Sequence, residues 1–307
     1  MASTYEYIST LADDTASAVV KSEKEWKQYL TTAARLYKYP FKEQLLIYAQ
    51  RPDASACAPI EVWNRKMHSW VYRGSKGIAL IDEENEHGGK LKYVFDASDV
   101  YKLRRGGIDL NLWVLREEHK ESVLGHLEEI YGKTDVREPF ERRLIEIADR
   151  IAEESYKELL PDLLYLTEGS YLEELDEQNI GVRFRDTLSS GIAYMLLSRC
   201  GADMDVWGDD FSFEFIHEFN TKDTLTVLGE STTDLSRDVL VEIRRTIREY
   251  EREKAKQKEP KMQQKEPKCS KKSSIVYRTG IKTIYEIAFM KIWKKVLKMI
   301  MRRTIMI

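Results

Sequence analysis

The hydrophobic period changes twice along this 307-residue chain, and this change constrains the fold most strongly. Between residues 22 and 37, apolar side chains recur at spacings of three and four, as on one face of an amphipathic helix. Between residues 69 and 95, short β-rich runs alternate with Gly-containing separators. From residue 117 onward the helical spacing returns. The pattern predicts an α+β N-terminal domain, with helices followed by a short antiparallel β-meander, and a mostly α-helical second domain.

Local signals predict where the first helices begin and end. Ser22-Glu-Lys-Glu25 has the form of a capping box and predicts a helix that starts there. Pro40 favours the opening of a second helix over residues 41–50, which Arg51-Pro52-Asp53 ends. A short third helix is expected around residues 60–66. In the second half, the clearest helical segments are residues 123–131, 140–160, 187–200 and 236–256.

Strands are expected over residues 69–72, 77–82 and 90–95. Gly74-Ser-Lys-Gly77 is expected to form a tight hairpin between the first two strands, and residues 83–89 a longer polar loop. The expected organisation has five parts: a flexible N-terminus (1–21), the α+β domain (22–116), an acidic helical domain (117–255), a disordered linker (256–280) and a basic amphipathic tail (281–307).

Charge is distributed unevenly along the chain. Residues 1–95 carry a net charge of +1, residues 96–235 carry −17 and residues 236–307 carry +13. A segment at −17 repels phosphates, so any nucleic-acid surface is expected at the two ends of the chain. The acidic segment is compatible with docking a protein partner or with mimicking nucleic acid, and the sequence does not decide between these.

The chemistry-bearing residues predict no enzyme, cofactor or metal site. Cys57, Cys200 and Cys269 lie far apart and form no CxxC, so neither a disulfide framework nor a zinc site is expected, and the cytosol is the expected compartment. No GxxxxGK[ST], GxSxG, Rossmann or kinase string is present. The paired carboxylates are interpreted as a solvated face.

A basic and aromatic-rich stretch lies between residues 35 and 77. Eight basic residues oppose three acidic ones, which gives this stretch a net charge of +5. The basic residues are Arg35, Lys38, Lys42, Arg51, Arg65, Lys66, Arg73 and Lys76, and the aromatic residues among them are Tyr37, Tyr39, Phe41, Tyr48, Trp63, Trp70 and Tyr72. Single-stranded nucleic acid is held by aromatic rings under its bases and by cations along its backbone. On composition alone, ordinary core aromatics with a solvated charged face are the better explanation, because aromatic and basic residues are commonly mixed.

The run YKYPFKEQLLIYAQRPDASACAPIEVWNRKMHSWVYRGSKGIALID, followed by LKYVFDASDVY, resembles the N-terminal domain of ArdC-type antirestriction proteins. It is more similar still to the version found at the start of large LtrC-like, helicase- or methylase-bearing proteins of Gram-positive conjugative elements. The resemblance covers about residues 20–101, a third of the chain. It implies sequence-tolerant single-stranded DNA binding in a mobile-element protein, for DNA transfer or antirestriction. The alternative is a non-catalytic remnant or protein-interaction scaffold of a larger protein.

By position, the resemblance implies a set of binding residues. We add Arg65, which lies between the predicted binding residues Asn64 and Trp70 in the same basic stretch. They are Tyr39, Gln44, Gln50, Arg51, Trp63, Asn64, Arg65, Trp70, Arg73 and Lys76. Trp26 and Tyr37 are assigned to the core instead. Two departures from the family limit the transfer. His217-Glu218 starts an HExxH pattern but lacks the second histidine, and no helicase or methylase module follows.

The last 27 residues allow three interpretations. They are dense in Ile, Met, Lys and Trp, with no acidic residue after Glu286. They could form an amphipathic helix on an anionic membrane, which is the weakest alternative, or a second basic DNA arm. We favour the third, out-of-frame sequence after a truncation or frameshift, because the composition breaks sharply with what precedes it.

Overall fold

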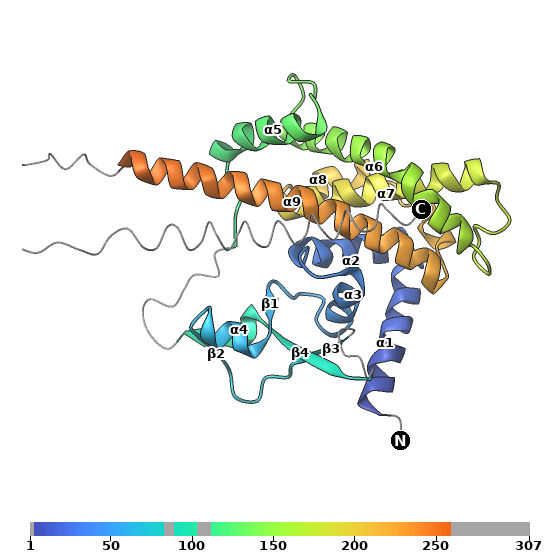
Figure 1. The fold of residues 1–307 in the computed structure, drawn as a ribbon, viewed down its shortest axis with the longest axis horizontal. Coiled ribbons are helices and arrows are strands. Elements are labelled where there is room, and N and C mark those ends of the chain that lie inside the picture. The colour runs from blue at the N-terminus through green and yellow to red at the C-terminus, as the bar shows by residue number, and fades with distance from the viewer. Residues whose placement is uncertain (1–2, 83–88, 103–111, 259–307) are drawn as a thin grey trace, which may run out of the picture. The chain divides into compact units, whose positions relative to one another are not determined.

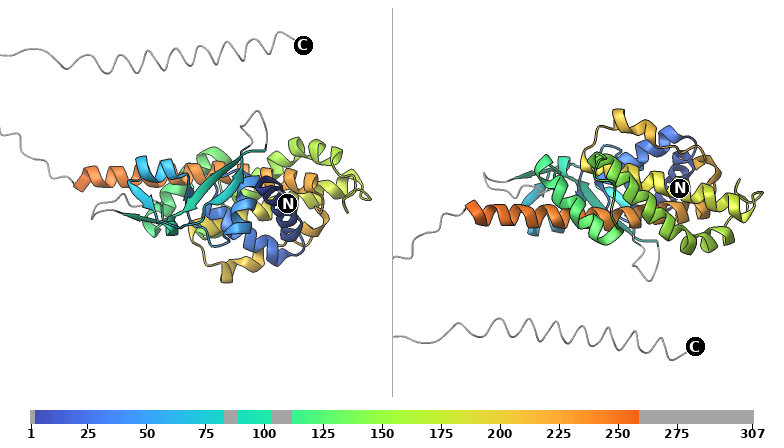
Figure 2. Two further views of the ribbon diagram at one scale, coloured as in Figure 1. Left: turned by 90° about the horizontal axis from the view of Figure 1, so that it is seen from below. Right: turned by 90° about the horizontal axis from the view of Figure 1, so that it is seen from above.

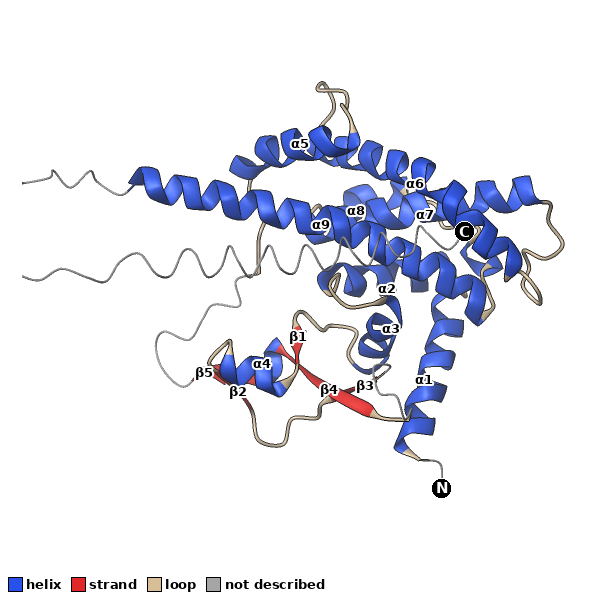
Figure 3. Ribbon diagram, in the orientation of Figure 1, coloured by secondary structure: helices blue, strands red, loops and turns tan. Residues whose placement is uncertain are grey.

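The computed structural model describes residues 3–82, 89–102 and 112–258, which are mostly helical with two small antiparallel sheets (Figure 1). The α-helices are α1 (Thr4–Val19), α2 (Glu23–Arg35), α3 (Phe41–Gln50), α4 (Ile60–Arg65), α5 (Glu117–Tyr131), α6 (Phe140–Tyr165), α7 (Glu177–Cys200), α8 (Met204–Trp207) and α9 (Lys222–Lys258). The strands are β1 (Cys57–Ala58), β2 (Ser69–Val71), β3 (Ile78–Ile81), β4 (Leu91–Asp96) and β5 (Val100–Lys102). Figure 3 shows that the strands gather beside α3 and α4.

Helix α1 occupies residues for which the sequence predicts a flexible N-terminus. A capping box opens it: the Glu6 backbone N–H donates to Ser3 Oγ (3.2 Å), and the Ser3 N–H donates to the Glu6 carboxylate (2.6 Å). Ile8 and Val19 are buried. The prediction failed because the helix buries few apolar residues and depends on packing against α3, which a local pattern does not reveal.

Helices α2, α3 and α4 confirm the predictions for this part of the chain. The Glu25 N–H donates to Ser22 Oγ (3.3 Å) at the start of α2. Helix α3 follows Pro40 and ends at Gln50, as its flanking residues predict. Helix α4 follows Pro59 and spans residues 60–65.

The strands form two sheets instead of one meander. One sheet has the order β1-β4-β3, with Ile78 opposite Val94, and a two-stranded ribbon pairs β2 with β5, with Trp70 opposite Tyr101. The predicted hairpin between β2 and β3 is therefore wrong. The Ser75 N–H does donate to the Tyr72 carbonyl (3.1 Å) in a tight turn, but this turn leads from the ribbon to the other sheet.

Glycines shape this connection. Gly74 has a φ of 94°, which L-residues rarely adopt and which a type II turn requires at its third position. Gly77 packs beneath Tyr93 and Phe95 of β4, where an added Cβ would lie 3.2 Å from both side chains. The local turn signal was therefore real, but it did not reveal which strands pair.

One hydrophobic core spans the expected boundary at residue 116. Helix α2 packs against α7, and α3 packs against α9. Gly229 of α9 allows the α3 contact, because an added Cβ would lie 2.2 Å from the ring of Phe41. Trp26 and Tyr37 are buried in this core, as predicted. The described residues up to 258 belong to one compact unit. The division into domains 22–116 and 117–255 stays a prediction.

The later helices are longer than the sequence predicts. Helix α7 begins at residue 177, where Asp176 Oδ1 accepts the Asn179 N–H (2.9 Å), and α6 continues through Pro161. Helix α9 begins at Lys222 and packs along α5, α6 and α7 (Figure 2). It ends within the predicted linker, and the rest of the linker and the basic tail lie outside the described residues. Within the described part, no helix is long and apolar enough to cross a bilayer.

A buried ion pair joins α5 to α6 and should make stability depend on pH. Glu128 accepts hydrogen bonds from Thr134 and from Arg143 Nη2 (2.5 Å), which lower its pKa to about 2. Because this folded-state pKa lies below the ordinary carboxyl value, the unfolded chain takes up the proton first. The stabilisation is present above about pH 4.5 and is lost as the pH falls toward 2.

We predict that Glu128→Gln removes this acid-dependent component and destabilises the chain by about 3 kcal/mol at pH 7, since Arg143 loses its buried partner. Urea unfolding followed by circular dichroism at several pH values between 3 and 7 measures both effects. Equal pH dependence in the variant and the unmodified chain would contradict the assignment.

Candidate nucleic-acid interface

The β2–β5 ribbon presents an aromatic face to solvent. Trp70 lies opposite Tyr101, and Tyr72 follows two residues later, so all three side chains lie on the same face of the ribbon. The rings of Tyr72 and Tyr101 are 4.9 Å apart at an interplanar angle of 34°. Tyr72 is 53% exposed, Tyr101 is 36% exposed and Trp70 is half-buried. The exposed parts of these rings are available for contact with a ligand.

Cations flank the aromatic face. Arg73 and Lys76 are exposed in the turn that leaves β2. Arg65 and Lys66 are exposed at the end of α4, and His68 turns the chain from α4 into β2 with a φ of 47°. Among the described residues, none of the four Arg and Lys side chains is within salt-bridge distance of a carboxylate. Their charge is therefore available to an anionic ligand.

Polar contacts brace the ribbon against the rest of the fold. The Asp96 carboxylate accepts the N–H groups of Ser55 (2.7 Å), Ala56 (3.0 Å) and Ser98 (2.9 Å). Burial tends to raise its pKa, but these hydrogen bonds outweigh burial and lower it, so the carboxylate stays ionised. This network fixes the short turn between β4 and β5 and therefore the position of Tyr101.

Arg51, predicted as a binding residue, also stabilises the turn between β4 and β5. Its Nη1 donates to Asp99 Oδ2 (2.7 Å) and to Ser98 Oγ (3.2 Å). The hydrogen bond to Asp99 raises the pKa of the guanidinium. Because Asp99 neutralises its charge, Arg51 is a weaker candidate for a phosphate contact than Arg73.

Two predicted aromatic residues belong to the structure of the domain. Trp63 is buried, and its Nε1–H donates to the Phe95 carbonyl (2.9 Å), which ties α4 to β4. The Tyr39 hydroxyl donates to the Cys57 carbonyl (2.7 Å). Asn64 is half-buried, and its Oδ1 makes no hydrogen bond within the described residues. Trp63 and Tyr39 therefore lie outside the exposed face.

Both predicted glutamines are occupied inside the fold. Gln44 is fully buried and hydrogen-bonds to four neighbouring groups. Gln50 holds the outer edge of β3: its Nε2 donates to the Ala79 carbonyl and its Oε1 accepts the Ala79 N–H, both at 2.9 Å. A carboxamide here takes the place of a neighbouring strand. Neither glutamine is available to orient DNA.

The sequence prediction missed Tyr93 and Tyr101. Tyr93 is 48% exposed on β4, on the face that Gly77 leaves open. Both tyrosines occur within the run that carries the family resemblance. Tyr93 lies between the more buried Lys92 and Val94, and Tyr101 follows the more buried Val100. This alternation was the available signal for exposed aromatic side chains.

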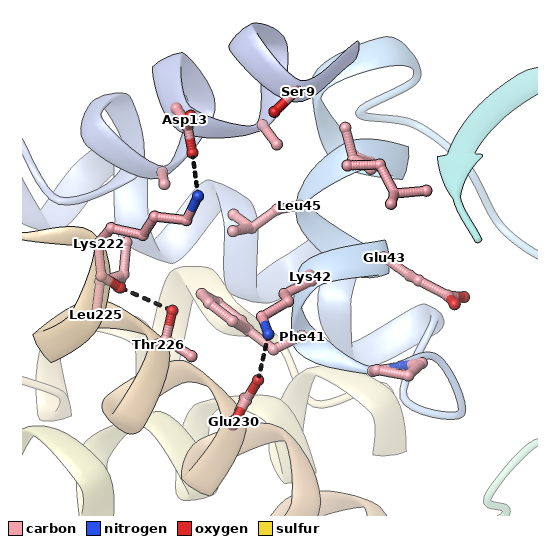
Figure 4. A pocket seen from close by; sticks show the side chains of 15 residues that line it. Ser9, Asp13, Phe41, Lys42, Glu43, Leu45, Lys222, Leu225, Thr226 and Glu230 are labelled. Atoms are coloured by element: carbon pink, nitrogen blue, oxygen red, sulfur yellow. Dashed lines mark hydrogen bonds and ion pairs between the residues drawn. The ribbon is translucent and has the colours of Figure 1, made fainter. Parts of the chain in front are cut away.

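A separate pocket of about 240 Å³ lies between α1, α3 and α9 (Figure 4). Its floor is apolar, with Phe41, Leu45 and Leu225, and its rim is charged. Ion pairs join Lys222 to Asp13 (2.8 Å) and Lys42 to Glu230 (3.5 Å). These two ion pairs engage four of the charged side chains that line the pocket.

The position of Gln44 gives a testable prediction about its role. Gln44→Ala leaves the Tyr29 and Thr233 hydroxyls and the Tyr39 carbonyl without their buried partner. We expect a loss of about 2–4 kcal/mol in the free energy of unfolding, measured by urea denaturation. Affinity of the folded variant for DNA should stay unchanged. If the variant instead lost DNA affinity while its stability stayed unchanged, Gln44 would be a binding residue and this prediction would be wrong.

Comparison with protein-family models, with curated proteins and with solved structures finds no match to this chain. The resemblance to ArdC-type domains therefore remains a prediction from the motif run. What the chain does has to be argued from the geometry of the described residues.

Proposed function

We propose that this chain binds single-stranded DNA without strong sequence preference through the aromatic face of the β2–β5 ribbon. One observation carries the proposal: Trp70, Tyr72 and Tyr101 share an exposed ribbon face beside Arg73 and Lys76, which pair with no carboxylate among the described residues. Bases stack on aromatic faces regardless of their identity, and cations hold the backbone phosphates.

The geometry favours a single strand over a duplex. Stacking on a protein ring requires an unstacked base, and the bases of a duplex are already stacked on one another. The paired residues of the two-stranded ribbon, Trp70 and Tyr101, carry large π-faces, whereas base edges are read mainly by amide and guanidinium groups. Base identity therefore contributes little to the proposed binding.

The broader biological role is an extension of this proposal. The motif run that resembles ArdC-type and LtrC-like proteins supports a role in a conjugative mobile element, in DNA transfer or in protection of incoming DNA. We propose no catalytic step, and the acidic helices remain candidates for contact with a protein partner. The ribbon is the part of the chain on which the DNA-binding proposal depends.

Removal of one stacking ring should weaken binding without unfolding the chain. Tyr72→Ala should lower the affinity for a fluorescent oligothymidine by a factor that corresponds to about 1–3 kcal/mol. Tyr72→Phe keeps the ring and should retain most of the affinity, so it is the matched control. Fluorescence anisotropy measures both. Equal affinity of the alanine variant and the unmodified chain would refute the stacking role.

The cations of the turn should determine the salt dependence. Arg73→Gln combined with Lys76→Gln should reduce the slope of log affinity against log salt by about 0.7 for every phosphate that the variant no longer neutralises. Lys157→Gln, on the distant helix α6, is the control and should leave the slope unchanged. If the unmodified chain does not bind single strands at low salt, the proposed function is wrong.

A further inference from the structure

A second pocket, of about 260 Å³, opens where the chain turns between α2 and α3 and meets α7 and α9. Five basic side chains line it: Arg35, Lys38, Arg199, Arg244 and Arg248. No Asp or Glu is found among its lining residues in the described part of the chain. The charged side chains that line this pocket are therefore all positive.

Two of the five cations are already engaged. Arg35 Nε donates to the Ala54 carbonyl (2.8 Å), and its Nη2 donates to the Pro52 carbonyl (2.7 Å). Arg199 lies over the Trp113 ring, 3.6 Å from its centroid, and donates to the Trp113 carbonyl (2.9 Å). These contacts hold the guanidinium groups in place, and the carboxylates of Asp53 and Asp96 offset part of the charge of Arg35.

The other three cations are open to a ligand. Arg244 and Arg248 lie one turn apart on α9, so they project from the same helix face. Neither of their side chains makes a salt bridge or a hydrogen bond within the described residues. Lys38 lies at the exposed mouth of the pocket, with its Nζ 5.7 Å from the centroid of the Tyr37 ring.

The cations of the pocket act on one another. Partial burial lowers the pKa of the Lys38 ammonium, and the guanidinium groups of Arg244, Arg248 and Arg199 lower it further. Burial also lowers the pKa of Arg199. Like charges are thus held close together at a cost in free energy, and a bound anion would offset that cost.

We propose that this pocket binds a phosphate monoester or diphosphate group. A monoester carries a charge of about −1.5 to −2 at pH 7 and has three acceptor oxygens, whereas a backbone phosphodiester carries about −1. Several cations around a small volume favour the ligand with the higher charge, which is the monoester or the diphosphate. Guanidinium groups also match phosphate oxygens in bidentate geometry. The proposal is independent of the ribbon, because the two sites use different side chains on different elements.

The phosphate could belong to a free oligophosphate or to the 5′ end of a DNA strand, and two arms of one experiment separate these sources. Calorimetry with pyrophosphate, in phosphate-free buffer, tests the free ligand. Anisotropy with oligothymidines that carry either a 5′-phosphate or a 5′-hydroxyl tests the strand end. Saturable binding of pyrophosphate supports the proposal. Higher affinity for the 5′-phosphorylated strand than for the 5′-hydroxyl strand also supports it, provided that competing pyrophosphate abolishes this difference in affinity.

Variants assign the binding to the pocket. Arg244→Gln and Arg248→Gln should each lower the affinity for the phosphate ligand about 10-fold or more, since each removes a charge-assisted hydrogen bond. Arg248→Lys keeps the charge and should retain part of the affinity. Arg245→Gln is the matched control on the same helix, because Arg245 is exposed and pairs with Glu249 (3.3 Å).

The outcomes separate this proposal from the DNA-binding one. Tyr72→Ala should weaken the binding of either oligothymidine but leave pyrophosphate affinity unchanged. The phosphate proposal is overturned if pyrophosphate does not bind and the 5′-phosphate adds no affinity. It is also overturned if Arg244→Gln and Arg248→Gln bind as tightly as Arg245→Gln. Loss of single-strand binding with intact pyrophosphate binding would refute only the ribbon proposal.

Discussion

The buried carboxamide of Gln44 is the interaction on which the arrangement of the described residues depends. Its Oε1 accepts hydrogen bonds from the hydroxyls of Tyr29 on α2 (3.0 Å) and Thr233 on α9 (3.2 Å), and its Nε2 donates to the Tyr39 carbonyl (2.9 Å). A buried polar group without partners is costly, so these elements can pack only in a register that satisfies all of them. Gln44 thereby fixes the turn before α3 against a helix nearly 190 residues away in sequence.

Polar contacts of the same kind position the two small sheets relative to the other end of α3. Gln50 hydrogen-bonds to the backbone of Ala79 at the edge of β3. The Asp96 carboxylate accepts hydrogen bonds from the N–H groups of Ser55, Ala56 and Ser98. The ribbon itself has little core of its own, since Tyr72 and Tyr101 are exposed. The surface that we propose to stack bases needs to be held rigidly by its surroundings, and carboxylate and carboxamide groups contribute to this where apolar packing is thin.

Local signals in the sequence predicted those elements whose ends are fixed by their own residues. Helix α3 lies between Pro40 and Arg51 as expected, because proline and the residues around it restrict the backbone directly. Strand pairing depends on residues far away, so the turn at Gly74 was identified while the partners of β2 and β3 were not. Helix α1 and the shared core likewise come from packing between distant segments.

Composition identified the region of the candidate site but not the orientation of its side chains. Trp63 and Trp70 lie seven residues apart in the same basic stretch, yet Trp63 hydrogen-bonds inside the domain and Trp70 belongs to the ribbon face. In the sequence, only the alternation of inward and outward side chains along a strand could distinguish the buried Trp63 from Trp70 on the ribbon face. Strand β2 is three residues long, too short for that alternation to be clear. The missed Tyr101 enters the site through pairing with Trp70, which no local signal predicts.

Net charge per segment was a poor guide to the local electrostatic field. Residues 96–235 carry −17, which predicted that they would repel phosphates. Arg199 belongs to that segment, yet the fold places it beside Lys38, Arg244 and Arg248, which come from the other two segments. Electrostatic interactions weaken beyond about 8 Å in physiological salt, so an anion at this pocket would respond mainly to the side chains that line it. The local charge at this pocket is therefore set by tertiary contacts between segments of opposite average sign.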